Sequence, residues 1–182
     1  MGSVRVTGGS LRGRRIQVPS GCRPSSSRVR EALFSIWAQR LPGARFLDLF
    51  AGSGVVGIEA LSRGADFIAL VEGDRRRFHA LVATLREVDN ESSDAYLLHL
   101  PAELGKLSSR TASTFDLVFA DPPYAFDDVE ALLDGGAQLL AAGGELAIEH
   151  SRRRQVALPH DALAVVDERN YGESSLTFFQ RR

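Results

Sequence analysis

Apolar and polar residues alternate along this chain in two periods, one typical of strands and the other of helices. From residue 45 onwards, apolar runs of strand length recur at 45–50, 67–71, 95–99, 115–120 and 144–149. Stretches with helical periodicity lie between them, at about 55–63, 74–88, 102–109 and 128–141. This alternation predicts a parallel, doubly wound sheet with right-handed crossovers. Gly64 and Gly143 stand where helix C-termini favour a left-handed residue.

The alternation stops after Glu149. Residues 163–169 and 174–180 are predicted to be two further strands, joined by Asn170-Tyr171-Gly172-Glu173 without a crossover helix. We therefore expect an α/β, Rossmann-like fold. Its sheet would be open, mostly parallel and seven-stranded, and would end in an antiparallel hairpin.

The first 26 residues follow another pattern. Residues 4–7 and 15–18 are short β-like runs on either side of the glycine-rich turn 8–13, which predicts a small β-hairpin with arginines at its tip and edge. A loop rich in Ser, Gly and Pro then runs from Pro19 to Ser27. We expect a basic N-terminal extension at residues 1–26 and the main domain at residues 27–182.

A helix is predicted to begin near Ser27 or Arg28, with a serine as its N-cap. Its apolar face is formed by Val29, Leu33, Ile36 and Trp37. Arg28, Arg30 and Arg40 are expected to project elsewhere, toward solvent or a ligand.

Amino-acid composition restricts the class of protein and its cellular compartment only slightly. The length of 182 residues suits one domain with a small extension, and 44% hydrophobic and 25% charged residues are ordinary for a globular protein. No apolar run approaches the roughly 18 residues that span a bilayer, and no secretory signal precedes the first strand. Cys22 is the only cysteine, which excludes an internal disulfide and favours a reducing compartment. We expect a cytoplasmic protein without membrane contact.

Charge is distributed unevenly. Residues 1–45 hold nine arginines and one acid, Glu31, a net charge of +8, whereas the remainder holds 13 basic and 22 acidic residues, a net charge of −9. A basic extension on an acidic domain favours a polyanionic partner. The alternative is a solvated arginine-rich surface, although that does not explain the one-sided placement.

The loop that follows the first strand of the main domain is the first candidate binding site. Residues 46–54 pass from a strand into a loop in which Gly52 and Gly54 allow a sharp turn and a close approach to a ligand. Gly57 completes the spacing of a dinucleotide fingerprint, and the next strand ends in Glu72. A nucleoside-type cofactor is therefore expected at this strand end.

Asp48 bears on which cofactor is bound. Its carboxylate stands four residues before Gly52, where it would repel a pyrophosphate and attract an ammonium group. This electrostatic argument favours S-adenosylmethionine over a nicotinamide dinucleotide. The alternative is a structural glycine turn with solvated acids.

A second candidate site follows the strand at 115–120. Asp121-Pro122-Pro123-Tyr124 places a carboxylate, carbonyl groups and an aromatic ring on a stiff turn, which could hold a planar amino group. The alternative is a Pro-Pro turn with a surface acid and a packing tyrosine. His79, His99, His150 and His160 are scattered without ligand spacing, so no metal site is expected.

These motifs together carry a resemblance. Asp48–Gly54, Glu72 and Asp121–Tyr124 resemble class I S-adenosylmethionine-dependent methyltransferases that act on exocyclic amines. The likeness is more specific to the bacterial methyltransferases that modify a guanine N2 in 16S ribosomal RNA. That closer likeness rests on the segments Gly9–Arg15, Arg23–Phe34 and Gly57–Ala65.

The resemblance implies a role for each matching residue. The methionine part of the cofactor would lie against Asp48, Phe50, Ala51, Gly52, Ser53 and Gly54. The ribose hydroxyls would bind Glu72, and the target base would be held by Asp121, Pro122, Pro123 and Tyr124. Many such enzymes contact adenine through Asp-Ala or Asn-Ala after the third strand. Here that position reads Leu100-Pro101-Ala102-Glu103, which leaves Ala102, Glu103 and backbone groups for the task.

Phosphate contacts are assigned to Arg5, Arg12, Arg14 and Arg15, whereas Arg23, Arg28 and Arg30 either contact RNA or line the pocket. The implied enzyme is a monomer that methylates 16S rRNA, within a 30S particle or assembly intermediate, releases S-adenosylhomocysteine and needs no metal. Three alternatives stay open at this point. They are another amine methyltransferase acting on DNA adenine N6 or a protein amide, a non-catalytic RNA-binding factor, and a nicotinamide oxidoreductase.

Overall fold

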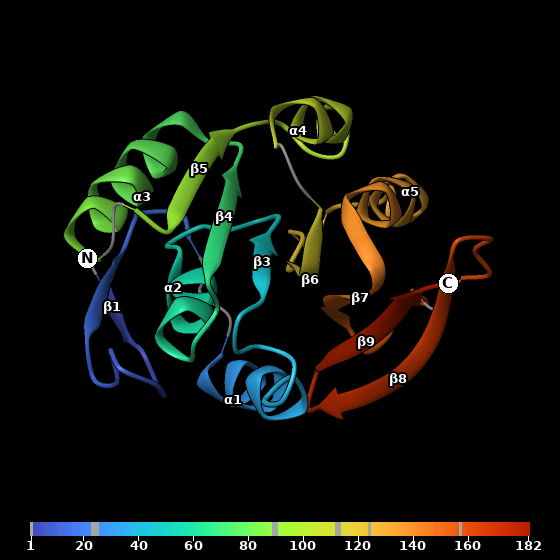
Figure 1. Ribbon diagram of the computed structural model, residues 1–182, viewed down its shortest axis with the longest axis horizontal. Helices are drawn as coiled ribbons and strands as arrows, with labels where there is room; N and C mark the ends of the chain where they lie inside the picture. Colours follow the sequence, from blue (N-terminus) through green and yellow to red (C-terminus); the bar gives the residue numbers. More distant parts are fainter. Residues whose placement is uncertain (1, 23–25, 89–90, 112–113, 124, 157) are drawn as a thin grey trace.

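Figure 1 shows the computed structural model, in which all residues are described except 1, 23–25, 89–90, 112–113, 124 and 157. The strands are β1 (Gly2–Arg5), β2 (Arg15–Val18), β3 (Arg45–Asp48), β4 (Phe67–Glu72), β5 (Ser93–Leu97), β6 (Phe115–Ala120), β7 (Leu140–Ser151), β8 (Leu163–Tyr171) and β9 (Ser174–Arg181). The helices are α1 (Ser27–Ile36), α2 (Val55–Ser62), α3 (Arg75–Val88), α4 (Leu104–Arg110) and α5 (Val129–Leu139).

Seven strands form one sheet in the order β5-β4-β3-β6-β7-β9-β8, and β1 and β2 pair separately. The pairs within β5 to β7 are parallel, whereas β9 pairs antiparallel with both β7 and β8. The predicted fold class is therefore confirmed. The chain runs outward from β3 to β5 and then returns to β6 on the other side, so the switch point of the sheet lies at β3 and β6.

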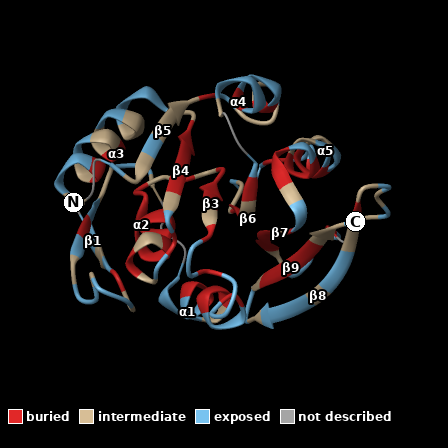
Figure 2. Cartoon of the chain, in the orientation of Figure 1, coloured by how far each residue is buried: buried red, intermediate tan, exposed pale blue. Residues whose placement is uncertain are grey.

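Helices cover both faces of this sheet (Figure 1). The core on one face is formed with α1, α2 and α3, and the core on the other face with α4 and α5. Figure 2 shows the buried surfaces along the central strands and the inner sides of the helices, while β8 is largely exposed at its edge. None of the helices among the described residues is long and apolar enough to cross a membrane.

Successive residues of the central strands point to opposite faces, and this alternation later positions the site. In β3, Phe46 lies in the core under α1 and α2, and Leu47 lies in the core under α4 and α5. Asp48, the last residue of β3, therefore points to the α1–α2 face. It is fully buried there.

The N-terminal hairpin is packed onto the main core. Val6 and Ile16 are buried in the cluster that includes α1 and α2. The fully buried carboxylate of Glu59 in α2 accepts hydrogen bonds from the backbone N–H and hydroxyl of Thr7 and forms an ion pair with Arg63. Apolar burial and this carboxylate together attach the hairpin to α2.

Arg30 corrects one prediction. Its side chain is only 1% exposed, and it forms an ion pair with Glu59 at 3.6 Å and donates a hydrogen bond to the Arg5 carbonyl oxygen. The expectation that Arg30 projects toward solvent or a ligand is wrong, because its side chain reaches neither the surface nor the cavity. Desolvation lowers the pKa of this guanidinium, with the Glu59 charge opposing the shift.

Element boundaries differ from the predictions in a few places. The first strand is Gly2–Arg5 rather than 4–7, and Ser26 caps α1 by accepting from the Val29 N–H. Gly64 is left-handed after α2, as expected, with φ of 104°. Gly143 is also left-handed, but it lies inside β7 rather than at the end of α5, so that prediction is wrong. The sequence pattern cannot distinguish a helix end from a bend in the strand that follows.

Candidate active site

A cavity of about 860 Å³ opens at the carboxyl ends of β3, β4, β6 and β7, next to the switch point. Its walls come from the glycine loop after β3, the exits of β4, β5, β6 and β7, and the loop before α1. Two predicted motifs therefore share one site. Phe50, Gly52 and Glu72 line it on one side, and Asp121, Pro122 and Pro123 on the other.

The glycine loop is shaped by residues beneath the cavity surface. Ala51, Ser53 and Gly54 were predicted to bind cofactor, but they do not line the cavity, and Ala51 and Ser53 are buried. Gly52 and Gly54 have φ of 54° and 77°. A Cβ on Gly54 would lie 2.4 Å from a methyl group of Leu81, so this glycine is required both by its conformation and by the helix packed against it.

Four carboxylates lie at the ends of four adjacent strands: Glu72 of β4, Asp48 of β3, Asp121 after β6 and Glu149 of β7. The residues two positions earlier all lie in the core under α1 and α2, and they are Leu70, Phe46, Phe119 and Ala147. Because side chains alternate between faces, all four acids point to that same face. We call them the acid row.

The acid row is stepped. Asp48 is in register with Leu70 of β4 and with Phe119 of β6, so Glu72 and Asp121 each stand two residues further along their strands. At roughly 3.3 Å per residue, Asp48 lies about 6.6 Å deeper than its neighbours. Asp48 is accordingly absent from the cavity wall.

Burial makes the Asp48 carboxyl a weaker acid than usual. Desolvation raises the pKa of its carboxyl to about 8, and the negative charges of Asp121 and Glu72 contribute to this rise. The Phe50 N–H donates a hydrogen bond to the carboxyl at 3.3 Å and opposes the rise. At neutral pH the free protein therefore holds this group largely protonated. Asp48 was predicted to lie close to the glycine loop and to hold the methionine part of the cofactor, and the structure places it under that loop, outside the cavity wall.

Glu72 is held by the chain itself. One carboxylate oxygen, Oε2, accepts from the Gly52 N–H at 3.1 Å. The other, Oε1, accepts from the Asp74 N–H and from two nitrogens of Arg77. These bonds fix the carboxylate between the glycine loop and α3. Oε2 takes one of these hydrogen bonds, and a carboxylate oxygen has capacity for a second.

The turn after β6 presents Asp121 and Pro122, both partly exposed, to the cavity. The Pro123 carbonyl oxygen accepts a hydrogen bond from the Phe126 N–H at 2.8 Å. The Phe126 ring packs edge-on against the Phe50 ring, with 5.5 Å between the ring centroids. The turn and the glycine loop are thus linked by an aromatic contact. Tyr124, predicted to hold the base, lies outside the described residues.

The exit of β5 differs from its prediction. His99 and Leu100 line the cavity, whereas Ala102 and Glu103 do not. Glu103 accepts from the His99 N–H and forms an ion pair with Lys106, so its carboxylate stabilises the start of α4. Nothing in the sequence indicated which residue of this loop would reach the cavity.

Several cavity residues were missed from the sequence, and they are Gly21, Cys22, Ser26, Gly73, Asp74, Arg75, Arg77, Glu149, His150, Ser151, Arg154 and Ser174. The rule that ligands bind at the carboxyl ends of parallel strands could have found Glu149, since the strand predicted at 144–149 ends there. No local signal indicated that the loop before α1 would cover the glycine loop. Within the described chain, no group of His, Cys, Asp or Glu is arranged to hold a metal ion.

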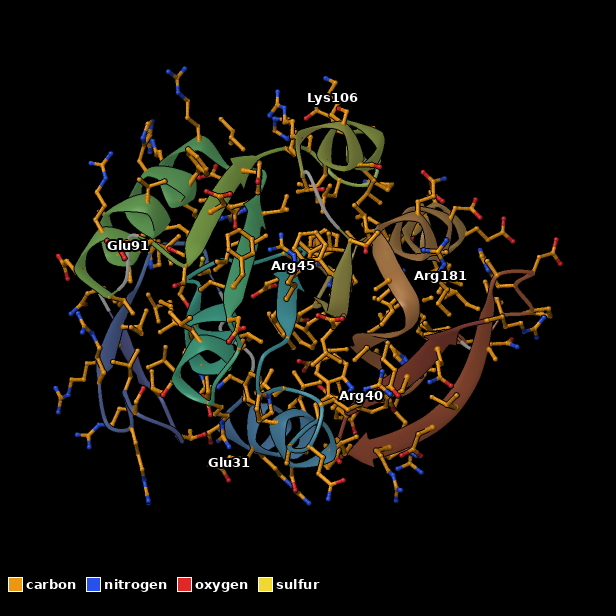
Figure 3. The ribbon with its side chains drawn as sticks, viewed as in Figure 1. Glu31, Arg40, Arg45, Glu91, Lys106 and Arg181 are labelled. Atoms are coloured by element: carbon orange, nitrogen blue, oxygen red, sulfur yellow. The ribbon has the colours of Figure 1, made fainter. Side chains whose placement is uncertain are left out.

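The arginines of the basic extension have different environments. Arg5, Arg12, Arg15 and Arg28 are exposed, Arg14 is partly exposed and donates to the Glu87 carbonyl oxygen, and Arg23 lies outside the described residues. Arg40 and Arg45, labelled in Figure 3, serve intramolecular contacts. Arg40 forms an ion pair with Glu145 of β7, and the Arg45 guanidinium lies 4.4 Å from the centroid of the Phe67 ring.

Arg5 and Arg15 lie directly opposite each other in the antiparallel β1–β2 pair. Like charges in this position are destabilising. Neither forms an ion pair with any residue that the structure describes. Such a pair indicates a surface suited to an external anion.

A family model described as "Conserved hypothetical protein 95" matches residues 4–180. The chain belongs to this family. The resemblance between the chain and bacterial ribosomal RNA methyltransferases is also confirmed by individual relatives.

Two curated relatives carry methyltransferase names. "Putative rRNA methyltransferase YlbH" of Bacillus subtilis is 31% identical over 186 residues, covering 98% of this chain and 100% of the relative. "Ribosomal RNA small subunit methyltransferase D" of Escherichia coli K12 is 37% identical over 153 residues, covering 81% of this chain and 72% of the relative. Among solved structures, the "Putative methyltransferase yhhF" of Escherichia coli superposes with a TM-score of 0.84 at 30% identity, covering 100% of this chain and 99% of that one.

Proposed function

We propose that this protein transfers a methyl group from S-adenosylmethionine to the exocyclic N2 amine of a guanine in 16S rRNA of the small ribosomal subunit. The observation that carries the proposal is that the glycine loop with Glu72 and the Asp121-Pro122-Pro123 turn line one cavity. A cofactor site and an amine-holding turn that face each other are what such a transfer requires. The printed names of the relatives support ribosomal RNA as the substrate.

The donor set of the cavity fits this cofactor. Glu72 lines the cavity beside Gly52, and its Oε2, which takes one hydrogen bond from the Gly52 N–H, can accept a second from a ribose hydroxyl. Three acids of the row, Glu72, Asp121 and Glu149, line the cavity and would repel a pyrophosphate, whereas S-adenosylmethionine carries an ammonium and a sulfonium and no phosphate. When bound, S-adenosylmethionine supplies the methyl group as an electrophilic carbon and leaves as S-adenosylhomocysteine.

The chain's own contribution is to hold the amine. We assign one amine hydrogen to the Asp121 carboxylate and the other to the Pro122 carbonyl oxygen, so that the nitrogen lone pair points toward the cofactor side of the cavity. As the nitrogen–carbon bond forms, Asp121 stabilises the positive charge that develops on the amine, and the amine then releases one proton to Asp121 or to water. Asp121 need not be a strong base, because an alkylated amine is acidic. Reaching the amine requires the base to leave any helix it occupies, and we assign Tyr124 to stack on it.

Residues 1–26 serve, in this proposal, as the RNA-binding extension of the methyltransferase domain at 27–182. The backbone of Ser10, near the hairpin tip, donates to the carbonyl oxygen of Ser62, at the end of α2 remote from the cavity. Eight residues of helix span about 12 Å, so Arg12 would contact phosphates some distance from the target base. Action on a 30S particle or assembly intermediate, by a cytoplasmic monomer, belongs to the same proposal.

Tritiated methyl transfer tests the proposal directly. Wild-type protein is incubated with labelled S-adenosylmethionine and, separately, with total RNA, 30S particles, DNA and protein, and the labelled product is digested to nucleosides. We expect label in N2-methylguanosine from the RNA samples alone. Asp161→Asn, an exposed position outside the cavity, is the matched control, and Asp121→Ala should abolish most transfer. Label confined to DNA or protein, or equal transfer by Asp121→Ala, would refute the proposal.

A further inference from the structure

Glu149 is a cavity residue without a role in the transfer described above. It lies near the carboxyl end of β7, its side chain is buried to about nine-tenths, and it lines the same cavity as Asp121. Ala120 of β6 is in register with Ile148 of β7, so Asp121 and Glu149 stand level on neighbouring strands. Neighbouring strands are about 4.8 Å apart, so the backbone positions of these two residues are separated by less than the width of one base.

The order of the strands fixes which part of the base each carboxylate meets. The cofactor residues belong to β3 and β4, on one side of β6, and Glu149 belongs to β7, on the other side. An amine held at Asp121 and directed toward the cofactor leaves the rest of its base extending toward β7. The amine-bearing carbon of guanine is flanked by N1, on the Watson–Crick edge, and by N3. A carboxylate on that side complements N1, because N1 carries a hydrogen whereas N3 is an acceptor.

N1 distinguishes guanine from other amine-bearing purines. In guanine N1 carries a hydrogen and is a donor, whereas in adenine and in 2-aminopurine N1 is an acceptor. A carboxylate accepts and cannot donate. Glu149 therefore complements guanine and leaves two acceptors facing each other when the base is 2-aminopurine, although that base has the same N2 amine.

Two other polar side chains at this end of the cavity, His150 and Arg154, have partners within the chain. The His150 ring bonds to the Thr177 hydroxyl at 2.8 Å and to the Ser151 carbonyl at 2.9 Å. Arg154 forms an ion pair with Asp127. We propose that Glu149 is a specificity-determining residue that accepts the N1–H of the target guanine while Asp121 accepts from its N2 amine. This inference rests on the proposed function and names the group that selects its base.

The role of Glu149 is tested by combining a substitution of the target base in the RNA with a substitution of Glu149 in the protein. Two RNAs are prepared that differ at the target position alone, one with guanine and one with 2-aminopurine, and kcat/KM is measured on each. The wild type should prefer guanine by about 10–100-fold. Glu149→Gln has a rotatable amide that can donate to the N1 of 2-aminopurine, so we expect its preference for guanine to fall by at least about tenfold. Glu130→Gln, on the exposed face of α5, should behave as the wild type.

Calorimetry with S-adenosylmethionine separates this result from a general loss of structure, because Glu149→Gln should bind the cofactor as the wild type does. If Glu149→Gln does not fold, Glu149→Asp and Glu149→Ala replace it. The aspartate variant should keep the guanine preference and the alanine variant should lose it. An unchanged preference in the Gln variant, or in both replacements, overturns the assignment of Glu149 while leaving guanine methylation intact. Absence of N2-methylguanosine with the wild type would overturn the proposed function instead.

Discussion

The molecule holds two groups of like charge, and it stabilises them differently. In the acid row at the cavity, Glu72 and Asp48 are buried and compensated from within the chain: Glu72 accepts hydrogen bonds from Gly52, Asp74 and Arg77, and Asp48 is held largely protonated. The hairpin arginines are exposed, and Arg5 faces Arg15 across the two strands. The first arrangement is pre-organised before any ligand arrives. The second leaves its repulsion to be relieved by a partner.

This difference separates effects on chemistry from effects on encounter. Buried charges act over short distances in a low-dielectric site and are little affected by salt, whereas exposed charges steer a polyanion and are screened at physiological ionic strength. Mutations in the acid row should therefore change kcat or cofactor affinity. Mutations in the hairpin should change RNA affinity and its salt dependence.

The largest effect is expected at Asp121. Asp121→Ala removes the group assigned to the amine, and the loss of one pre-organised electrostatic partner costs about 10²–10³-fold in kcat. Cofactor affinity should stay within about twofold of wild type, since Glu72 and Gly52 are untouched. Single-turnover methyl transfer and calorimetry measure the two quantities. A loss of cofactor binding as large as the loss of rate would show that the two halves of the cavity are not separable.

Reversal of three hairpin arginines should have the next largest effect. Arg12, Arg14 and Arg15 changed to Glu should weaken RNA binding by at least about 50-fold at 150 mM salt and lower the slope of log affinity against log salt by two to three units, at about one unit per phosphate contact. The kcat at saturating RNA should change little. Binding that is unchanged at physiological salt would refute the assignment of these arginines to phosphates.

Arg30 supplies the contrasting control for the hairpin. It belongs to the basic first 45 residues, but its side chain is fully buried and pairs with Glu59. Arg30→Ala should therefore lower the free energy of unfolding by about 3 kcal/mol, because it removes one of the two cations that compensate Glu59 and leaves a cavity in the core. Chemical denaturation measures this loss. The salt slope of RNA binding by the remaining folded protein should equal that of the wild type.

The sequence predicted the sheet well because its evidence is local. Runs such as 115–120 have strand length and apolar composition, and the order of strands and helices alone implies the parallel topology. It also predicted Gly52, Glu72 and Asp121 as site residues, because these follow strands directly. It failed where the outcome depends on a distant partner. Arg30 is buried because Glu59, 29 positions away, needs a cation, and no pattern around Arg30 records that.

Depth within the site was equally hidden from the sequence. Asp48 and Glu72 both end strands, but the register places Asp48 two residues lower, beneath the glycine loop. Register between strands is a tertiary property. Ala102 and Glu103 were misplaced for a related reason, since Glu103 turns back to His99 and Lys106 rather than toward the cavity.

Glu72 tests whether the cofactor half is rigid. Glu72→Gln keeps an oxygen for the Gly52 N–H but loses the charge opposite Arg77, which is about a third exposed and therefore partly screened. We expect cofactor affinity to fall about tenfold, with kcat at saturating cofactor within about threefold of wild type. Calorimetry and steady-state rates measure these. Glu87→Gln, exposed on the same helix as Arg77, is the matched control.

The pH dependence of stability conferred by Asp48 isolates burial from catalysis. Its pKa is raised from an ordinary value near 3.8 to about 8 in the folded protein, so between those values the folded state binds a proton that the unfolded chain has released. The contribution of this proton to the free energy of unfolding is therefore fully present below about pH 4 and is lost as pH rises toward 8. The slope reaches at most about 1.4 kcal/mol per pH unit. Chemical denaturation of the free protein at pH 6, 7 and 8 should show this decline, and Asp48→Asn should flatten it.

A cationic ligand above the loop favours the ionised carboxyl, so cofactor binding at pH 7 should release up to one proton, as measured by calorimetry in buffers of different ionisation enthalpy. An identical slope in the wild type and in Asp48→Asn would mean that Asp48 is ionised in the free protein, and that the acid row is compensated by hydrogen bonds alone.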